Sequence, residues 1–431
     1  MRFRIISLIL VLSMALPLAS CSKNLGPETL PETTLPVATE STESTETTKE
    51  TAPTETEPLP PEPTSIPLVT KKPVKTYGQL YVVNGLITTR TKSPVILRGV
   101  SSAPLNECNG FFGAETVKTI AEDWGADVLR IAVPADKGED SYITNADKVF
   151  KQTCEIIDHC IAQGIYVIVN WHNYNDGDPN ANKKKAVEFF TRIAGIYADS
   201  PNVMYEICNE SNGIRSGDKK KRAVDWNATI KPFAEDVIKA IRAIDKDNII
   251  IVGTTDYSRD IDKAAASPIK GVNICYSVHF SAATDGEALQ EKITAAKDKG
   301  LCILVTEWKA TDSSGVSAAD AQNSSVWLDF LEENKIGWIN AYIYANNTSN
   351  MNGLLFDTNG RYSIEDIFAG HWPDGLISDS GIIVRDRLLG AKGTKKPDTV
   401  YTPEEPGEVG DADDAGDEGD EGEQDIPDPE E

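Results

Sequence analysis

Eight short apolar runs, separated by amphipathic stretches of helical length, constrain this chain more than any other feature. The runs lie at 95–100, 127–133, 166–172, 203–210, 249–253, 274–280, 302–308 and 338–344. Most are continuous in Val, Ile and Leu rather than alternating, as in parallel strands that are covered on both faces. Stretches such as 146–164, 184–198 and 230–245 have the spacing of amphipathic helices. Eight strand–helix pairs predict an α/β fold, a single (β/α)8 TIM barrel.

A doubly wound α/β sheet is the main alternative for a chain in which strands and helices alternate. Such a sheet usually carries a Gly-rich phosphate loop after its first strand, and RGVSSAPL at 98–105 is not one. No Pro- or Gly-rich linker interrupts the alternating region, so we expect one domain over residues 74–392. The segment 77–89 contains Asn84-Gly85 between apolar residues, which predicts a β-hairpin that closes the barrel floor.

The amino-terminal end has the pattern of an export signal. Arg2 and Arg4 precede an apolar stretch that is too short for a stable membrane span, as in secretory signal peptides. The stretch ends in Leu-Ala-Ser-Cys, which resembles the lipobox of bacterial lipoproteins and implies a signal peptide over 1–20 and lipidation of Cys21. An ordinary secreted protein is the alternative. We expect an exported chain that is lipid-anchored at the outer face of the bacterial cell membrane and has no other membrane contact.

Two segments that flank the barrel lack the apolar residues that a core requires. Residues 21–73 are rich in Thr, Glu and Pro, and we expect a disordered linker. Residues 393–431 are predicted to form an acidic disordered tail, with 15 acidic and no basic residues from Glu404 onward. Because these segments carry most of the net charge of −25, the barrel itself is only mildly acidic. This balance argues against a nucleic-acid partner, and we expect the tail mainly to solubilise the chain.

The cysteines form no recognisable metal motif. Six remain apart from Cys21, and neither a CxxC pair nor a His/Cys spacing typical of zinc occurs. We therefore expect no metal site. Cys208, Cys275 and Cys302 lie in apolar runs, as buried thiols do. The sequence leaves open whether Cys108 pairs with another cysteine.

Two glutamates stand at the ends of apolar runs and are followed by polar residues. Glu210 ends the fourth run, and Glu307 is the penultimate residue of the seventh. An α/β barrel carries its chemistry at the carboxyl ends of its strands, and two carboxylates from different strands can flank one glycosidic bond. A single such glutamate is more often a salt-bridge partner, but two together favour catalysis.

Further polar and aromatic residues lie in the same runs. The chain has only four histidines, and two of them stand near strand ends. This coincidence predicts one shared site. Its candidate members besides the two glutamates are Arg130, His172, Asn209, His279 and Trp308.

Residues 77–390 resemble glycoside hydrolase family 5, particularly its bacterial endoglucanases. The matching stretches include GIYVIVNWHNYNDGDPN (164–180), PNVMYEICNE (201–210) and ILVTEW (303–308). The resemblance implies Glu210 as acid/base and Glu307 as nucleophile of a retaining hydrolysis that needs no cofactor. It also implies that Asn209 hydrogen-bonds the sugar 2-hydroxyl and that the other four candidates bind substrate or order the site. A neighbouring Arg130 would lower the pKa of Glu307, and burial near that anion would favour a proton on Glu210.

Three positions depart from the family pattern. Ser281 stands where the family usually has an aromatic hydroxyl, Ala341 where it has a Trp platform for sugar, and Ala103 where it has a sugar-binding His. The aromatic residues that could supply a substitute face are Tyr174, Phe280, Tyr342 and Tyr344.

These expectations combine into a surface-anchored, monomeric retaining endo-β-1,4-glucanase that acts on β-glucan polysaccharide. One alternative is a glycan-binding barrel with weakened catalysis, which the three departures suggest. Another keeps the mechanism on mannan, xyloglucan or mixed-linkage glucan, because the reacting carboxylates do not select the polymer.

Overall fold

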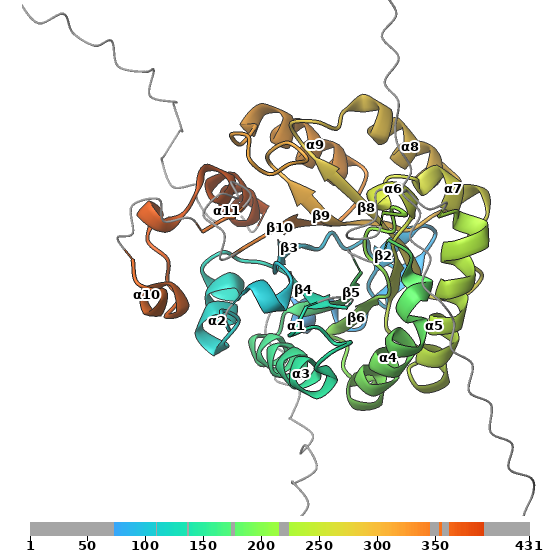
Figure 1. Cartoon of the computed structure of the whole chain (residues 1–431). Helices are drawn as coiled ribbons and strands as arrows, with labels where there is room; N and C mark the ends of the chain where they lie inside the picture. Colours follow the sequence, from blue (N-terminus) through green and yellow to red (C-terminus); the bar gives the residue numbers. More distant parts are fainter. Residues whose placement is uncertain are drawn as a thin grey trace, which may run out of the picture. The chain divides into compact units, whose positions relative to one another are not determined.

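Eight parallel strands close into a barrel in the order β10-β3-β4-β5-β6-β7-β8-β9 (Figure 1). They are β3 (Arg98–Ser101), β4 (Val128–Pro134), β5 (Tyr166–His172), β6 (Val203–Glu206), β7 (Ile250–Val252), β8 (Ile274–Ser281), β9 (Ile303–Lys309) and β10 (Trp338–Ala341). The computed structural model describes residues 73–391 except 109, 136–137, 174–176, 215–223, 345–352 and 356–361. The predicted (β/α)8 fold is confirmed. Cys21, the linker and the acidic tail lie outside the described residues, so their predicted roles stay predictions.

Helices cover the outside of the strand ring (Figure 1). They are α2 (Ala114–Glu122), α3 (Ala146–Gln163), α4 (Lys183–Tyr197), α5 (Lys231–Ile244), α6 (Thr255–Ser258), α7 (Ile261–Ala266), α8 (Glu287–Asp298), α9 (Ala321–Glu333), α10 (Ile364–Phe368) and α11 (Asp379–Ala391). Shorter helical turns are η1 (Leu105–Glu107), η2 (Pro179–Asn182), η3 (Trp226–Ile230) and η4 (Asp374–Leu376). Among the described helices, none is long and apolar enough to cross a membrane.

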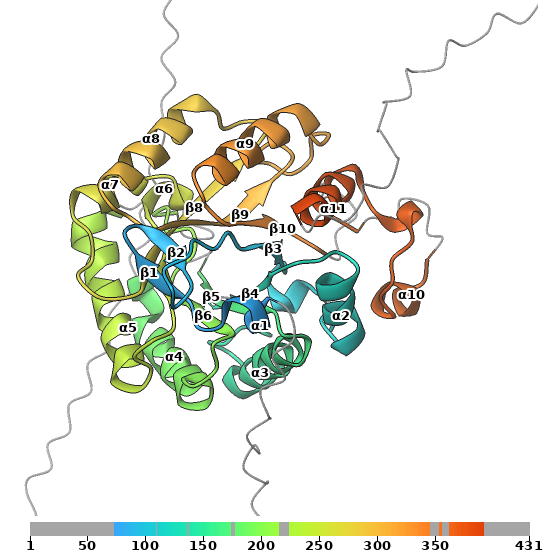
Figure 2. The same ribbon diagram turned by 180° about the vertical axis from the view of Figure 1, so that it is seen from behind.

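The amino-terminal end of the barrel is covered by α1 (Val74–Tyr77) and by the hairpin β1 (Tyr81–Val83) and β2 (Leu86–Thr88) (Figure 2). Asn84 and Gly85 have φ of 51° and 73°, the backbone that a two-residue hairpin turn requires and that Asn-Gly adopts easily. Leu80 and Ile87 are buried against the barrel interior. The predicted hairpin at the barrel floor is therefore confirmed.

The core has an inner and an outer layer. Side chains such as Tyr166, Met204 and Leu304 fill the barrel interior, and a larger apolar layer lies between the strands and the helices. Cys275 and Cys302 belong to the inner layer, and all six cysteines of the described region are free thiols.

Strand β6 is shorter than the apolar run that predicted it. It ends at Glu206, which pairs with Ile251 of β7 and lies four residues before Glu210. The backbone then passes close to Gly253, where an added Cβ would lie 2.4 Å from the Asn209 carbonyl oxygen. Glu210 is therefore presented from a segment beyond the strand rather than by the strand itself.

Candidate active site

A fully buried arginine forms the base of the site. From β4, Arg130 donates through Nε to Glu206 Oε2 at 2.6 Å and through Nη1 to Glu307 Oε2 at 3.1 Å. It also donates through Nη2 to Asn209 Oδ1 at 2.6 Å and through Nη1 to Ser101 Oγ at 3.1 Å. A guanidinium removed from water requires such partners. Arg130 thus holds side chains from four segments in one arrangement, beneath the site.

The second buried charge, Glu206, was missed by the sequence analysis. Its Oε2 accepts from Arg130, and its Oε1 accepts from the Thr306 hydroxyl at 2.6 Å. Burial opposes ionisation of Glu206, but the charge of Arg130 and the hydrogen bond from His279 outweigh it and lower the pKa to about 2. The sequence does contain an indication of this buried charge, because Glu206 interrupts an apolar run just as Arg130 does. Two opposite charges, each inside a buried apolar run, indicate an ion pair.

His279 connects this buried pair to Glu210. Its Nδ1 lies 2.9 Å from Glu210 Oε1, and its Nε2 lies 3.0 Å from Thr306 Oγ1. Burial lowers the pKa of His279, but the hydrogen bonds with Glu206 and Glu210 raise it by more, so the net shift is upward. The imidazole is therefore held in a fixed orientation between two acidic groups.

Glu307 is ionised at neutral pH. Burial opposes its charge, but His279 and then Arg130 stabilise the anion, and its pKa is lowered to about 2. The expected effect of Arg130 is thus present, although His279 contributes more. Lys309 and His172 act in the same direction.

A β-bulge in β9 explains how Glu307 reaches the site. Val278 pairs with Val305 and His279 pairs with Glu307, so Thr306 is an extra residue in β9. The extra residue lets Thr306 face the buried network while Glu307 faces the barrel mouth. Trp308 then points to the opposite side of the strand.

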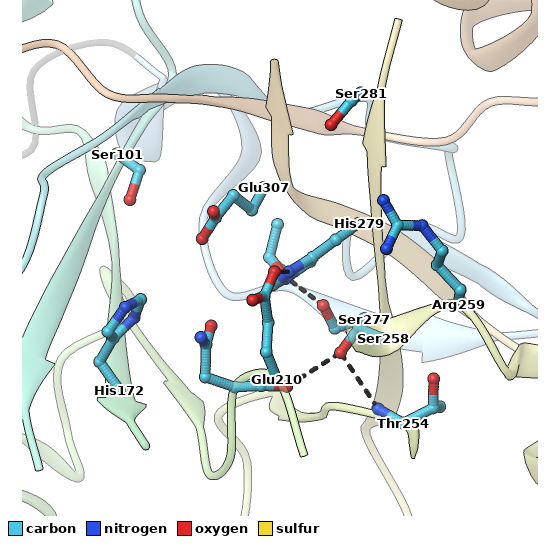
Figure 3. A network of polar contacts seen from close by, with 12 residues as sticks. Ser101, His172, Glu210, Thr254, Ser258, Arg259, Ser277, His279, Ser281 and Glu307 are labelled. Atoms are coloured by element: carbon cyan, nitrogen blue, oxygen red, sulfur yellow. Dashed lines mark hydrogen bonds and ion pairs between the residues drawn. The ribbon is translucent and has the colours of Figure 1, made fainter. Parts of the chain in front are cut away.

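Glu210, His279 and Glu307 converge on one space, with His172 on its other side (Figure 3). One ligand atom from each of Glu210, His279 and Glu307 lies within 4.8 Å of the other two. Among the described residues this is the group that could hold a metal ion, and two carboxylates with one imidazole are possible ligands. The same arrangement suits proton transfer, because the imidazole already contacts Glu210.

The cavity above this group has a volume of about 430 Å³. The predicted residues His172, Glu210, His279 and Glu307 line it. The rest of the lining consists of three aromatic residues and four polar or charged ones, namely Tyr257, Phe280, Tyr342, Arg259, Ser281, Lys309 and Ser313. Asn209 and Arg130 lie beneath these residues. The structure thus brings together six of the seven predicted site residues.

Trp308 is the residue that the structure does not bring to the site. Its ring is fully buried in the outer layer, stacked on Phe280 with centroids 5.6 Å apart and edge-on to Trp338 at 5.9 Å. Neighbouring residues of a strand point to opposite faces, so Trp308 faces the helices when Glu307 faces the mouth. This position does not fit the substrate contact expected for it.

The departures from the family pattern also have defined positions. Ser281 lines the cavity, whereas Ala103 and Ala341 are buried. Of the aromatic side chains considered as substitutes, Phe280 and Tyr342 line the cavity. Tyr344 instead stacks on Phe111 with centroids 4.6 Å apart, and Tyr174 lies outside the described residues.

Comparisons with known proteins show similarity over most of the barrel. The family model described as Cellulase (glycosyl hydrolase family 5) matches residues 88–347. Endoglucanase N of Pectobacterium atrosepticum is 35% identical over 335 residues, which cover 78% of this chain and 71% of that protein. Endoglucanase 5 of Pectobacterium carotovorum subsp. carotovorum is 34% identical over 338 residues, which cover 78% of this chain and 63% of that protein. The chain thus spans roughly two thirds of the length of these relatives.

A solved structure shares the fold over the same region. The catalytic domain of Thermobifida fusca endoglucanase Cel5A superposes with a TM-score of 0.66 at 32% identity. The superposition covers 73% of this chain and 99% of that domain. The similarity therefore extends over nearly all of that catalytic domain.

Proposed function

This chain belongs to glycosyl hydrolase family 5, and we propose that it is a retaining endo-β-1,4-glucanase that hydrolyses β-glucan polysaccharide. The observation that carries the proposal is the short separation of two carboxyl groups, one of which is held ionised. An oxygen of Glu210 and an oxygen of Glu307 lie within 4.8 Å. Retaining glycosidases place their carboxyl groups about 5–5.5 Å apart, whereas inverting enzymes need about 6.5–9.5 Å for a water molecule.

The two carboxyl groups take different roles in this mechanism. Glu307, kept anionic by His279 and Arg130, attacks the anomeric carbon while Glu210 gives its proton to the departing glycosidic oxygen. A covalent bond between Glu307 and the sugar replaces the glycosidic bond. Glu210 then removes a proton from water, which attacks the same carbon and releases Glu307. Two inversions return the sugar to its original anomeric configuration.

His279 supplies a defined partner for the proton of Glu210. The Thr306 hydroxyl donates to Glu206, so its oxygen accepts from Nε2–H of His279. That nitrogen is therefore protonated throughout. The remaining proton lies between Nδ1 of His279 and Oε1 of Glu210, which are 2.9 Å apart. A proton can pass between the two groups across this contact without a rearrangement of side chains.

Asn209 is arranged to contact the sugar. Its Oδ1 accepts from Arg130, which fixes the direction of the amide. Its buried Nδ2 has no hydrogen-bond partner within the described part of the chain. A buried donor without a partner is costly, and a sugar hydroxyl would satisfy it. This supports the proposed contact with the 2-hydroxyl group.

The nature of the polymer is tested by an activity panel on the mature chain. Carboxymethylcellulose, lichenan, xyloglucan and mannan share the two-carboxylate chemistry but differ in the sugars that the groove must hold. We expect the highest kcat/KM on a β-1,4-glucan. A higher kcat/KM on mannan or xyloglucan would identify that polymer as the substrate instead. Binding without release of reducing ends would favour a glycan-binding barrel with weakened catalysis.

The mechanism is tested separately by chemical rescue. Glu307→Gly should be inactive, and azide should restore cleavage of an activated β-glucoside with an α-glycosyl azide as product. Glu210→Gly with azide should give the β-azide, because azide then attacks the covalent intermediate. Azide products of the opposite configurations would contradict the assignment of the two residues.

We further propose that the chain is exported, lipidated at Cys21 and anchored as a monomer at the outer face of the bacterial cell membrane. The described chain begins at the barrel floor, where the Val74 amide donates to the Gly164 carbonyl. The site lies at the opposite end of the barrel, so a tether that leaves the floor would direct the mouth outward. Replacement of Cys21 by Ala should release the protein from the membrane fraction, and unchanged membrane association would contradict the anchor.

A further inference from the structure

A second cavity lies at the floor of the barrel, at the end opposite the catalytic site. It has a volume of about 750 Å³ and is lined by one side of the hairpin β1–β2 and by the loops that lead into β8 and β9. We call it the floor groove. Strands of a parallel barrel begin at this end, so none of the catalytic side chains reaches it.

The floor groove is basic, although the chain as a whole is strongly acidic. Its lining contains four cations, Arg90, Lys92, Lys246 and Lys299, against one anion, Asp247. All four cations are exposed. Within the described ranges, none of them forms an ion pair with an acidic side chain. The groove therefore presents a local excess of positive charge that the barrel does not neutralise.

Hydrogen bonds hold the walls of the groove together. Asn273 accepts from the Val82 amide through Oδ1 at 2.9 Å and donates to the Asp247 carbonyl at 2.5 Å. Arg242 donates to the Asn248 carbonyl at 2.8 Å and thereby fixes the neighbouring loop. The hairpin and two loops are thus joined through one side chain. A groove built in this way exists before a ligand arrives.

The acidic end of the same chain leaves the barrel close to this groove. Gly390 and Ala391, at the end of α11, share a pocket with Arg98, the first residue of β3. The chain therefore exits at the floor. The 12 residues between Ala391 and Glu404 can span at most about 40 Å. The groove extends along the starts of β7, β8 and β9, which lie two to four strands from β3 in the barrel, a separation of about 10–20 Å.

We propose that the acidic segment Glu404–Glu431 binds in the floor groove of its own chain. The ligand is thus a polyanionic peptide, recognised by charge rather than by a defined backbone conformation. Single surface ion pairs are weak and are screened by salt. Four cations facing 15 acidic residues at the millimolar effective concentration of a short linker compensate for that weakness. Binding of the segment covers the basic floor and leaves the catalytic mouth open.

Zero-length cross-linking of the full mature chain tests this proposal. A carbodiimide joins a lysine amine to a carboxylate only when the two are in contact, and mass spectrometry identifies the linked peptides. We expect Lys92, Lys246 and Lys299 to link to residues 404–431 at least fivefold more often than the exposed control lysines Lys184 and Lys239. Salt at 0.5 M should reduce these links strongly. Equal links to all exposed lysines would overturn the proposal.

Two further measurements separate this contact from its alternatives. A mixture of isotope-labelled and unlabelled chains should give links within one chain, whereas links between chains would identify a second copy as the occupant and overturn the proposal. A variant with Arg90, Lys92, Lys246 and Lys299 changed to Gln should show an expanded tail by small-angle scattering at low salt. A variant with Lys184 and Lys239 changed to Gln should not. No expansion in the first variant would also overturn the proposal.

Discussion

Arg130 and Glu206 form a fully buried ion pair, with 2.6 Å between Nε and Oε2, beneath the two carboxyl groups at the barrel mouth. The pair joins β4 to β6, and each partner has a second contact at the site: Arg130 with Glu307, and Glu206 with Thr306. Arg130 is therefore a positioning residue that holds Glu307 and Asn209 from below. Buried charges depend on each other, so one partner without the other is costly.

Glu206→Gln should destabilise the fold, because it leaves the Arg130 guanidinium buried without its closest counter-charge. Breaking a buried pair in this way costs about 3–5 kcal/mol, and denaturant unfolding measures the loss. The matched control is Glu188→Gln, which removes a half-exposed partner of Lys185 and should change stability by less than about 0.5 kcal/mol. A similar small change in Glu206→Gln would contradict the role assigned to the pair.

Glu210→Gln should lower kcat on cello-oligosaccharides by about 10²–10⁴-fold, the usual contribution of a general acid. The loss should be far smaller on an aryl cellobioside with an acidic phenol, because that leaving group needs no proton. Glu307→Gln should abolish turnover of both substrates. Equal losses on the two substrates in Glu210→Gln would show that Glu210 is not the proton donor.

Acid should destabilise the protein through Glu206 and Glu307. Both have a native pKa lowered to about 2 from an ordinary value of 4.5. Between these values the unfolded chain binds protons that the native chain does not, so the free energy of unfolding falls as pH decreases from about 5 towards 2. Unfolding curves at pH 6, 4 and 3 measure the slope. Glu206→Gln should flatten it, and an unchanged slope would contradict the pairing.

Alanine substitutions of Trp308 and Tyr342 should affect different properties, stability in the first case and KM in the second. Trp308→Ala removes a fully buried ring and should cost about 3–5 kcal/mol of stability, with KM unchanged in the folded fraction. Tyr342→Ala removes a ring from the cavity lining and should raise KM. Steady-state kinetics beside thermal unfolding separates the two effects. A raised KM in the milder Trp308→Phe variant would place Trp308 at the substrate after all.

Gly253→Ala should displace the backbone segment that carries Asn209 and Glu210. The added Cβ would lie 2.4 Å from the Asn209 carbonyl oxygen and 2.6 Å from that of Cys208, so the segment carrying Glu210 must move. We expect lower kcat and lower stability. The control is Gly195→Ala in α4, where a Cβ meets no atom within 4 Å and a helical Ala is better than Gly by about 0.5–1 kcal/mol. Full activity in Gly253→Ala would show that the segment adjusts freely.

The sequence alone determined the fold and pointed to the two carboxyl groups that we propose as the reacting pair. Eight apolar runs with helical stretches between them allow few arrangements other than a closed barrel, and Glu210 and Glu307 follow from their places near the ends of two runs. The hairpin at the floor was predictable because Asn84-Gly85 has a conformational preference of its own. These features depend on local patterns, which can be read without knowledge of strand pairing.

Only the tertiary structure decided which side chains meet. The role of Glu206 depends on a partner 76 residues away. Which of the neighbours Glu307 and Trp308 faces the mouth depends on the bulge at Thr306, which arises from the pairing of β9 with β8. The placement of Glu210 depends on the segment after β6, whose backbone passes close to Gly253 at the end of β7. Strand register and side-chain direction are set by neighbours distant in sequence, so residue type and spacing indicate a site but do not determine its contacts.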